Sequence, residues 1–279
     1  MTSSPTLTFN DGNTIPQLGY GVWQVEDDVA EKVVRQAFEA GFRHIDTAKI
    51  YGNESGVGRA IASSGLSAEE IFITTKLWNA DQGYESTLAA FEESMDRLGL
   101  ETLDLYLIHW QQPKQDKFVD TWKALIELKK RGRVKSIGVS NFTKEGLQRI
   151  IDETGVVPAI NQVELHPFFN QAELRAFNAS KGILTQAWSP LGQGGELLEN
   201  ATVAEIAAKH DATPAQVVIA WHLAIGNVVI PKSVTESRIQ ENFAALGVKL
   251  DDADVEAING LDRGAEGRIG PDPAVSDFA

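Results

Sequence analysis

The sequence contains no cysteine among its 279 residues. This absence excludes disulfide bonds, catalysis by a thiolate and metal sites with sulfur ligands. It also fits a reducing compartment, where disulfides are rare, so we expect a cytoplasmic protein. Histidine is scarce too, with 5 residues, and no dense group of histidine and acidic residues indicates a metal site.

Basic residues are too few to balance the acidic ones. The 25 lysines and arginines face 39 aspartates and glutamates, which gives a net charge of −14. Such a chain is repelled by nucleic acids and anionic membranes, so we expect neither as a partner. A small anionic ligand would need a local cluster of bases.

Long apolar runs are missing as well. The most apolar stretch, 217–230, contains His222 and Asn227 and is too short to span a bilayer. The first residues lack the basic and apolar leader of a signal peptide, so we expect none.

What the sequence does contain is a regular alternation of strand and helix patterns. An Asn-Asp-Gly-Asn turn between two short runs predicts a β-hairpin over 6–16. Eight strand patterns follow, over 18–22, 42–46, 71–75, 103–108, 134–139, 159–163, 183–187 and 228–230. Between and after them lie helical patterns over 27–40, 55–63, 84–98, 118–130, 143–152, 170–180, 201–209, 213–225 and 236–246.

This alternation predicts parallel strands with helices outside, and eight such units match a (β/α)8 TIM barrel. We expect an α/β fold of this kind over 1–279 as a single domain, with the N-terminal hairpin and extra C-terminal helical and loop segments. The alternative is a doubly wound open sheet. It is disfavoured because the turn from Gly19 to Gln24 lacks the third glycine of a Gly-x-Gly-x-x-Gly fingerprint.

Polar residues follow each strand, and on a barrel these ends face one mouth. They are Asp46 with Tyr51 on the next loop, Thr75, Lys76, His109, Ser140, Asn141, Gln162, Glu164, Trp188, Ser189, Lys232 and Ser233. Each alone has an ordinary structural explanation, such as a helix cap, a solvated lysine or a core histidine. The joint pattern differs, because four ionisable groups would converge.

Those four groups suggest a reaction. Asp46 beside Lys76 would keep the lysine cationic, and Lys76 beside Tyr51 would lower the pKa of the phenol from about 10. Tyr51 would then donate a proton near neutral pH, and His109 would orient a carbonyl oxygen. The arrangement suits adding a hydride to a carbonyl and protonating the alkoxide, with no metal required.

The same segments resemble the aldo-keto reductase family. The matching motifs are Gly41-Phe-Arg-His-Ile-Asp-Thr-Ala, Tyr51-Gly-Asn-Glu, Ile73-Thr-Thr-Lys-Leu-Trp, Asp104-Leu-Tyr-Leu-Ile-His-Trp, Ile137-Gly-Val-Ser-Asn-Phe, Asn161-Gln-Val-Glu-Leu-His-Pro, Trp188-Ser-Pro-Leu-Gly and Ile230-Pro-Lys-Ser. Within the family the chain is most similar to the bacterial 2,5-diketo-D-gluconate reductases. That closer match is carried by Pro16-Gln-Leu-Gly-Tyr-Gly-Val, Ala187-Trp188 and Pro190-Leu-Gly-Gln-Gly.

The resemblance implies NADPH-dependent reduction of an aldehyde or ketone, with 2,5-diketo-D-gluconate or a related keto sugar acid as a candidate. Tyr51 would be the proton donor, tuned by Asp46 and Lys76, and His109 would orient the carbonyl. The implied contacts to the nicotinamide are Ser140, Asn141, Gln162 and Trp188, and those to the pyrophosphate are Ser189, Leu191, Gln193 and Gly194. The remaining implied cofactor contacts are Gly21, Val22, Lys232, Ser233, Val234, Arg238, Glu241 and Asn242.

Lys232 and Arg238 near a helix start also form a cationic pocket in an acidic protein. Such a pocket suits a phosphate monoester and favours NADPH over NADH. Thr235 stands where the most similar relatives often have a second arginine, so we expect NADH to be accepted with lower preference.

Trp23, Trp78 and Trp110 are expected to line the substrate pocket, and such an aromatic funnel accepts varied aldehydes and ketones. Two features leave its shape open. Gln111 and Gln112 precede Pro113, whereas the family usually has proline directly after the His-Trp pair. The tail after Leu261 has no readable pattern, although in the family it shapes the pocket. We expect a monomer acting on a small carbonyl compound.

Two other functions remain open at this point. One is a cofactor-binding regulatory barrel with little turnover, which the presence of all four catalytic residue types disfavours. The other is a Schiff-base lyase with Lys76 as nucleophile. Trapping of a substrate adduct on Lys76 with borohydride would indicate the lyase.

Overall fold

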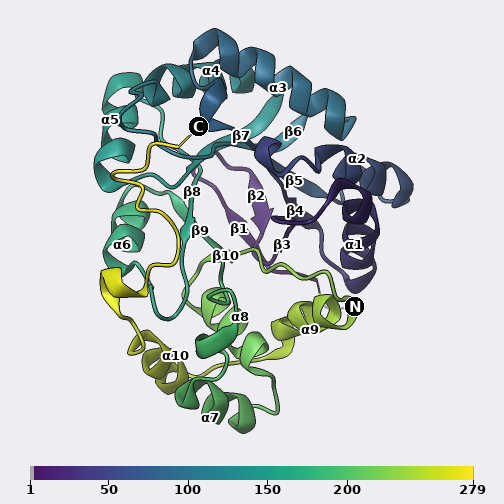
Figure 1. Cartoon of the computed structure of the whole chain (residues 1–279), viewed down its shortest axis with the longest axis vertical. Helices are drawn as coiled ribbons and strands as arrows, with labels where there is room; N and C mark the ends of the chain where they lie inside the picture. Colours follow the sequence, from purple (N-terminus) through teal and green to yellow (C-terminus); the bar gives the residue numbers. More distant parts are fainter. Residues whose placement is uncertain (1–2, 279) are drawn as a thin grey trace.

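The computed structural model describes residues 3–278, in which parallel strands form a barrel surrounded by helices (Figure 1). The strands are β1 (Thr6–Thr8), β2 (Thr14–Pro16), β3 (Tyr20–Gly21), β4 (His44–Asp46), β5 (Phe72–Leu77), β6 (Leu103–Ile108), β7 (Val134–Ser140), β8 (Ile160–Glu164), β9 (Leu184–Trp188) and β10 (Val228–Val229). The α-helices are α1 (Asp27–Ala40), α2 (Glu54–Ser63), α3 (Tyr84–Leu98), α4 (Phe118–Lys130), α5 (Lys144–Thr154), α6 (Ala172–Ser180), α7 (Ala201–Lys209), α8 (Pro214–Ala224), α9 (Glu236–Ala244) and α10 (Asp252–Asn259). Short 3-10 turns are η1 (Lys49–Tyr51), η2 (Asn79–Asp81), η3 (Gly195–Leu197), η4 (Ala245–Gly247) and η5 (Gly264–Gly267).

The eight strands β3 to β10 pair in chain order, each parallel to its neighbours. The two ends of this order also meet, because the N–H of Gly19 donates to the carbonyl of Val229 at 2.8 Å. The N–H of Gly21 likewise donates to Pro231 at 3.1 Å. The barrel is therefore closed, and the predicted (β/α)8 architecture is confirmed.

The N-terminal hairpin covers the end of the barrel opposite the strand carboxyl ends. β1 and β2 pair antiparallel, as predicted. Phe9 and Ile15 of the hairpin are buried in one apolar cluster with Phe72, Leu105 and Ile160 from the barrel strands. Apolar side chains therefore fill this end of the barrel, and the strand carboxyl ends form the other end.

The outer helices form where apolar residues recur at intervals of three and four. In α1 these residues are buried against the barrel, and they are Ala30, Val33, Val34, Ala37 and Phe38. The helix ends at Gly41, whose φ of 115° favours glycine. A Cβ atom at Gly41 would lie 2.5 Å from the ring of Phe243, so this glycine also lets α9 approach α1.

The C-terminal part adds a helix that the periodicity did not predict. α10 begins with a capping box in which Asp251 and Asp254 bond each other's backbone N–H groups. From there the chain runs back past α6 and α5, drawn in yellow in Figure 1. It ends beside η2, where the Nδ2 atom of Asn79 donates to the carbonyl of Phe278 at 2.8 Å. Within residues 3–278, no helix is both long and apolar enough to cross a membrane.

Candidate active site

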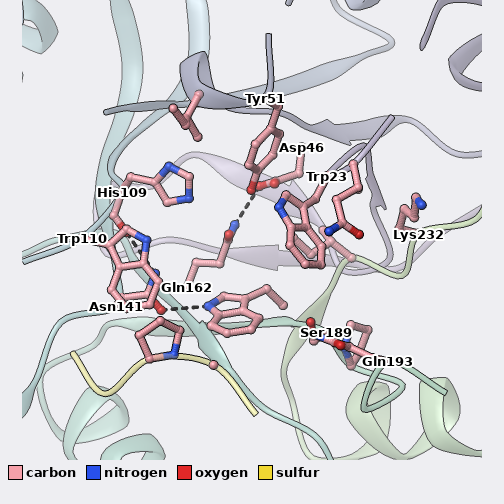
Figure 2. Close-up of a pocket in the computed structure, with 18 of the residues that line it drawn as sticks. Trp23, Asp46, Tyr51, His109, Trp110, Asn141, Gln162, Ser189, Gln193 and Lys232 are labelled. Carbon is pink, nitrogen blue, oxygen red and sulfur yellow. Dashed lines mark hydrogen bonds between the residues drawn. The ribbon is translucent and has the colours of Figure 1, made fainter. Parts of the chain in front are cut away.

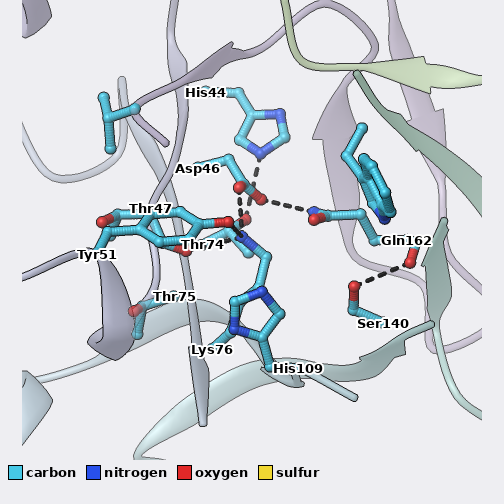
Figure 3. A network of polar contacts seen from close by, with 12 residues as sticks. His44, Asp46, Thr47, Tyr51, Thr74, Thr75, Lys76, His109, Ser140 and Gln162 are labelled. Atoms are coloured by element: carbon cyan, nitrogen blue, oxygen red, sulfur yellow. Dashed lines mark hydrogen bonds and ion pairs between the residues drawn. The ribbon is translucent and has the colours of Figure 1, made fainter. Parts of the chain in front are cut away.

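Four ionisable side chains meet at the carboxyl ends of β4, β5 and β6 (Figure 3). The Nζ atom of Lys76 donates to Oδ1 of Asp46 at 2.5 Å and to the carbonyl of Thr47 at 2.9 Å. Its third contact is the hydroxyl oxygen of Tyr51, at 3.5 Å. The ring of His109 lies edge-on to the ring of Tyr51, with centroids 5.7 Å apart. The sequence-based expectation that these groups converge agrees with this geometry.

The charge on Lys76 is held by its partners. The lysine is fully buried, and burial lowers the pKa of its amine, but Asp46 and Tyr51 together outweigh burial and leave that pKa above its ordinary value. The second oxygen of Asp46 accepts a hydrogen bond from Nε2 of Gln162 at 2.7 Å. Both carboxylate oxygens are thus satisfied, and Lys76 stays cationic.

Lys76 lowers the pKa of Tyr51 as predicted, but the expectation of a net pKa below the ordinary value is wrong. Burial raises the pKa of the phenol above its ordinary value, and the charge of Lys76 only partly offsets it. Burial and the same lysine hold the pKa of His109 well below its ordinary value, so its imidazole is neutral. Among the described residues, Nδ1 of His109 has no hydrogen-bond partner.

Asp46, Tyr51 and His109 border a cavity of about 520 Å³ at the barrel mouth (Figure 2). Tyr51 and His109 face it, whereas Lys76 lies beneath them. Its wall contains the three tryptophans expected there, Trp23, Trp78 and Trp110. The other lining residues are Gly21, Gln24, Asp46, Ile50, Asn141, Gln162, Trp188, Ser189, Pro190, Gln193, Ile230, Lys232, Gly270, Pro271 and Phe278.

A second polar network lies beside the first, at the ends of β7, β8 and β9. Ser140 donates to the carbonyl of Gln162 at 2.9 Å, and Nδ2 of Asn141 donates to the carbonyl of His109 at 3.0 Å. The indole N–H of Trp188 donates to Oδ1 of Asn141 at 2.8 Å. The ring of Trp188 lines the cavity and is therefore held in a fixed orientation there.

The loop after β9 has an unusual backbone conformation. Positive φ angles recur at Ser189 (47°), Gly192 (58°), Gln193 (58°), Gly194 (82°) and Gly195 (60°). Four of these residues, 192–195, are consecutive, and the N–H groups of Gly192 and Gly194 bond the carbonyls of Ser189 and Leu191 at 2.9 and 2.8 Å, which makes the loop a series of tight turns. Ser189 and Gln193 face the cavity, whereas Leu191 and Gly194 do not line it.

The loop after β10 and the first turn of α9 carry two exposed bases. Lys232 borders the cavity, and Arg238 lies one turn into α9. Within residues 3–278 neither base forms an ion pair with an acidic side chain. A cation on each side of a helix N-terminus suits a phosphate group.

The sequence matches the model of the Aldo/keto reductase family over residues 16–263. The chain belongs to the aldo/keto reductase family. It is 54% identical to an aldo-keto reductase of Mycolicibacterium smegmatis over 99% of both chains. It is 51% identical to the methylglyoxal reductase DkgA of Salmonella typhimurium, over 97% of this chain and 98% of that one. The crystal structure of a Gox0644 mutant in complex with NADPH has a TM-score of 0.95 and 51% identity, and the match covers 99% of this chain and 100% of that one.

Several residues that the resemblance assigns to the cofactor do not reach the cavity of this aldo/keto reductase. Val22, Ser140, Ser233, Val234, Arg238, Glu241 and Asn242 are outside its lining. Glu241 is engaged elsewhere, because its Oε1 accepts a hydrogen bond from the hydroxyl of Thr213 at 2.7 Å. Asn242 is buried in α9.

Other pocket residues were missed by sequence reasoning. Gln24 and Ile50 adjoin motifs that were recognised, and Pro190 and Ile230 belong to such motifs, so their position in the sequence was a usable signal. Gly270, Pro271 and Phe278 belong to the tail, which has no periodicity to interpret. The ring of Phe278 lies 5.0 Å from that of Trp110 and 6.0 Å from that of Trp78, and it completes the aromatic wall.

Asn53 is a missed residue that positions two loops of the site. Its Nδ2 donates to the carbonyls of Val22 and Val25, both at 2.8 Å, and its Oδ1 accepts from the hydroxyl of Thr47 at 2.7 Å. These bonds join the loop after β3 to the loop after β4. Asn53 is the third residue of the recognised Tyr51-Gly-Asn-Glu motif, which is the signal that could have identified it.

The loop after His109, whose shape the sequence left open, is fixed by amide side chains. The Nε2 atom of Gln82 donates to the carbonyl of Trp110 at 2.7 Å. Oε1 of Gln111 accepts from the N–H of Thr143 at 3.0 Å, and Gln112 adopts a φ of 51°. Gln111, which stands where the family has proline, therefore anchors this loop to the N-cap of α5, and Gln82 anchors it to the segment before α3.

Proposed function

We propose that this chain reduces a small aldehyde or ketone to the alcohol with NADPH, and that Tyr51 supplies the proton. The observation that carries the proposal is the contact of 3.5 Å between Lys76 Nζ and the Tyr51 hydroxyl at the floor of an aromatic cavity. Support also comes from the relatives, one of which is named a methylglyoxal reductase and another of which binds NADPH.

The residues around the cavity fit this cofactor. Asn141, Gln162 and the ring of Trp188 would hold the nicotinamide, and the loop 189–195 would bind the pyrophosphate through its backbone. Lys232 and Arg238 would bind the 2′-phosphate. When bound, the reduced nicotinamide supplies a hydride to the substrate carbonyl.

Lys76 and Tyr51 have different roles in proton transfer. The ammonium has three N–H groups, which face Asp46, Thr47 and the oxygen of Tyr51. Because Lys76 donates to that oxygen, the hydroxyl hydrogen of Tyr51 is free to donate to a carbonyl oxygen in the cavity. As the proton leaves, the phenolate forms against a fixed cation, which stabilises it.

His109 acts as a neutral donor. Its depressed pKa leaves one N–H on the ring, so it can donate to the carbonyl oxygen without bringing a second positive charge beside Lys76. Edge contacts with Tyr51 and Trp78, at centroid distances of 5.7 and 5.3 Å, fix the plane of the imidazole. Two donors then converge on the same oxygen.

The lyase alternative is disfavoured by the state of the lysine. A Schiff base requires a neutral amine, whereas Lys76 is paired with Asp46 at 2.5 Å and has a raised pKa. A regulatory barrel without turnover is disfavoured because the proton donor and its partners are arranged for catalysis around an open cavity.

Charge in the cavity favours a neutral substrate. Among the lining residues the only permanently cationic side chain is Lys232, which lies across the cavity from His109 (Figure 2). A small neutral dicarbonyl such as methylglyoxal therefore fits better than the anionic 2,5-diketo-D-gluconate, whose carboxylate would face an apolar wall.

The test is a substrate panel that follows oxidation of NADPH and NADH side by side. It contains methylglyoxal, a simple aromatic aldehyde and 2,5-diketo-D-gluconate. The proposal expects turnover of the neutral carbonyls with NADPH and a lower kcat/KM for the keto acid. Absence of NADPH oxidation with every carbonyl, together with tight NADP+ binding, would instead indicate the regulatory barrel.

A further inference from the structure

The loop that carries Lys232 is fastened to the barrel at two points. The N–H of Gly21 donates to the carbonyl of Pro231 at 3.1 Å, and the hydroxyl of Tyr20 donates to the carbonyl of Ser233 at 2.5 Å. Lys232 lies between these points, after the end of β10 and before the start of α9. No strand or helix fixes its backbone, so its position depends on these two bonds.

The surroundings of Tyr20 stabilise its hydrogen bond to Ser233. Only 1% of the residue is exposed, and burial raises the pKa of its hydroxyl well above the ordinary value, so the group stays a donor. Its ring packs on Phe42 with centroids 5.7 Å apart, and Phe42 packs on Phe243 of α9 at 5.0 Å. Tyr20 is thereby linked both to the Lys232 loop and to the helix that carries Arg238.

We propose that Tyr20 is a positioning residue that sets the preference of this chain for a cofactor with a 2′-phosphate. The proposal rests on the proposed NADPH-dependent function. Tyr20 itself does not line the cavity, and it acts through the loop. The hydrogen bond from Tyr20 to Ser233, called the tether below, keeps Lys232 near its binding position. The loop therefore loses less conformational freedom when a phosphate monoester binds.

A comparison of NADPH with NADH distinguishes this positioning role of Tyr20 from a general structural role. NADH has no 2′-phosphate, so a looser Lys232 loop leaves its binding almost unchanged. NADPH and NADP+ lose the benefit of the ordered loop. The net contribution of one neutral hydrogen bond predicts that Tyr20→Phe raises the Kd for NADP+ by about 3- to 10-fold and changes the Kd for NAD+ less than about 2-fold.

The variant keeps the ring that packs on Phe42, and the chain provides a matched control. Tyr106 is also fully buried, but its hydroxyl has no hydrogen-bond partner among the described residues. Tyr106→Phe therefore removes a buried tyrosine hydroxyl without releasing any loop. Thermal unfolding of both variants shows whether either change disturbs the fold.

The experiment is a titration of wild type, Tyr20→Phe and Tyr106→Phe with NADP+ and with NAD+, with no substrate present. Because Trp23 and Trp188 line the cavity, quenching of tryptophan fluorescence reports binding directly. The expected result is a fall in the ratio of Kd(NAD+) to Kd(NADP+) for Tyr20→Phe alone. In a Lys232→Met background, Tyr20→Phe should have almost no further effect on that ratio, because the tether acts through Lys232.

Each contrary result has a distinct meaning. If wild type prefers NADP+ and Tyr20→Phe keeps the wild-type ratio, the inference is overturned and the proposed function stands. An equal fall in the affinity for both cofactors also overturns it, because that result indicates general damage. A wild type that binds NADP+ and NAD+ equally overturns both the inference and the proposed cofactor preference.

Discussion

The Nζ atom of Lys76 lies 3.5 Å from the hydroxyl oxygen of Tyr51 but only 2.5 Å from Oδ1 of Asp46. The short contact is an ion pair that holds the lysine in place and charged. The longer contact points a cation at the phenol without binding it strongly. The two partners of Lys76 therefore contribute differently, and substitutions can separate stability from catalysis.

Replacing Tyr51 with phenylalanine should abolish turnover and leave the fold intact. The ring that contacts His109 remains, and the only hydrogen bond lost in the described part of the chain is the weak one from Lys76. Loss of a general acid predicts a fall in kcat of about 10²- to 10⁴-fold. The check is kcat with an active carbonyl substrate, beside an NADP+ titration that should match wild type. A variant that keeps more than a tenth of the activity would contradict the assignment of the proton donor.

Replacing Lys76 with methionine should instead damage stability as well as activity. It leaves the carboxylate of Asp46 buried without its cation, which typically costs about 3–5 kcal/mol. The measurement is the free energy of unfolding in urea. The matched control is Lys123→Met, because Lys123 forms an exposed pair with Asp120 at 3.0 Å and its loss should cost less than about 1 kcal/mol. Equal losses in the two variants would argue against a strong buried pair.

Most of the fold could be predicted because the signals are local. The bounds predicted for α1, α3, α4, α7 and β6 coincide with those in the structure, since glycines and polar residues mark the ends of clear periodic runs. Strict alternation then implied a barrel, and a barrel brings strand ends together. That geometry is why Asp46, Tyr51, Lys76 and His109 could be grouped before any coordinates were known.

The sequence could not predict features that depend on distances between side chains or that lie in segments without a periodic pattern. The direction of the Tyr51 pKa shift depends on two opposing effects, burial of the phenol and the charge of Lys76 at 3.5 Å. Neither the degree of burial nor this distance is visible in the sequence. Glu241 matches a family position, yet its carboxylate bonds Thr213. The tail that brings Phe278 to Trp110 has no regular secondary structure over residues 268–278, so no periodicity could place it.

Buried neutral histidines should make the free protein less stable in mild acid. Burial lowers the pKa of His44 and of His222 to about 3, and that of His109 falls well below its ordinary value. Below about pH 6.5 the unfolded chain binds protons at these sites and the folded chain does not. The free energy of unfolding should therefore be fully retained above pH 6.5 and fall as pH is lowered, by up to about 1.4 kcal/mol per pH unit for each histidine.

The check is urea unfolding between pH 7.5 and pH 5. In His222→Gln the amide can still donate to the carbonyl of Pro190, which Nε2 of His222 contacts at 3.2 Å. This variant should lose about a third of the slope that the three histidines produce. A wild-type stability that is flat over this interval would show that these imidazoles are protonated in the folded state.

Glu164 should control the substrate pocket through the tail. Its Oε1 accepts the N–H of Ile269 at 2.5 Å, and its Oε2 accepts the N–H of Gly270 at 2.7 Å. Glutamine has one acceptor oxygen, and its NH₂ group would face a backbone N–H. Glu164→Gln should therefore loosen the tail at a cost of about 1–3 kcal/mol and raise the KM for the carbonyl several-fold. The Kd for NADP+ should change less than this KM, because Phe278 of the tail packs on Trp78 and Trp110 of the substrate pocket.

Limited trypsin digestion separates a loosened tail from a general loss of stability. Arg268 directly precedes the clamped residues, and its side chain is 23% exposed, so a released tail should be cleaved faster after this residue. The control is Glu173→Gln, which removes an exposed carboxylate paired with Lys144 at 2.8 Å and should change neither KM nor cleavage. A higher KM without faster cleavage in Glu164→Gln would mean that the carboxylate acts on the pocket directly, since the tail would then still be held.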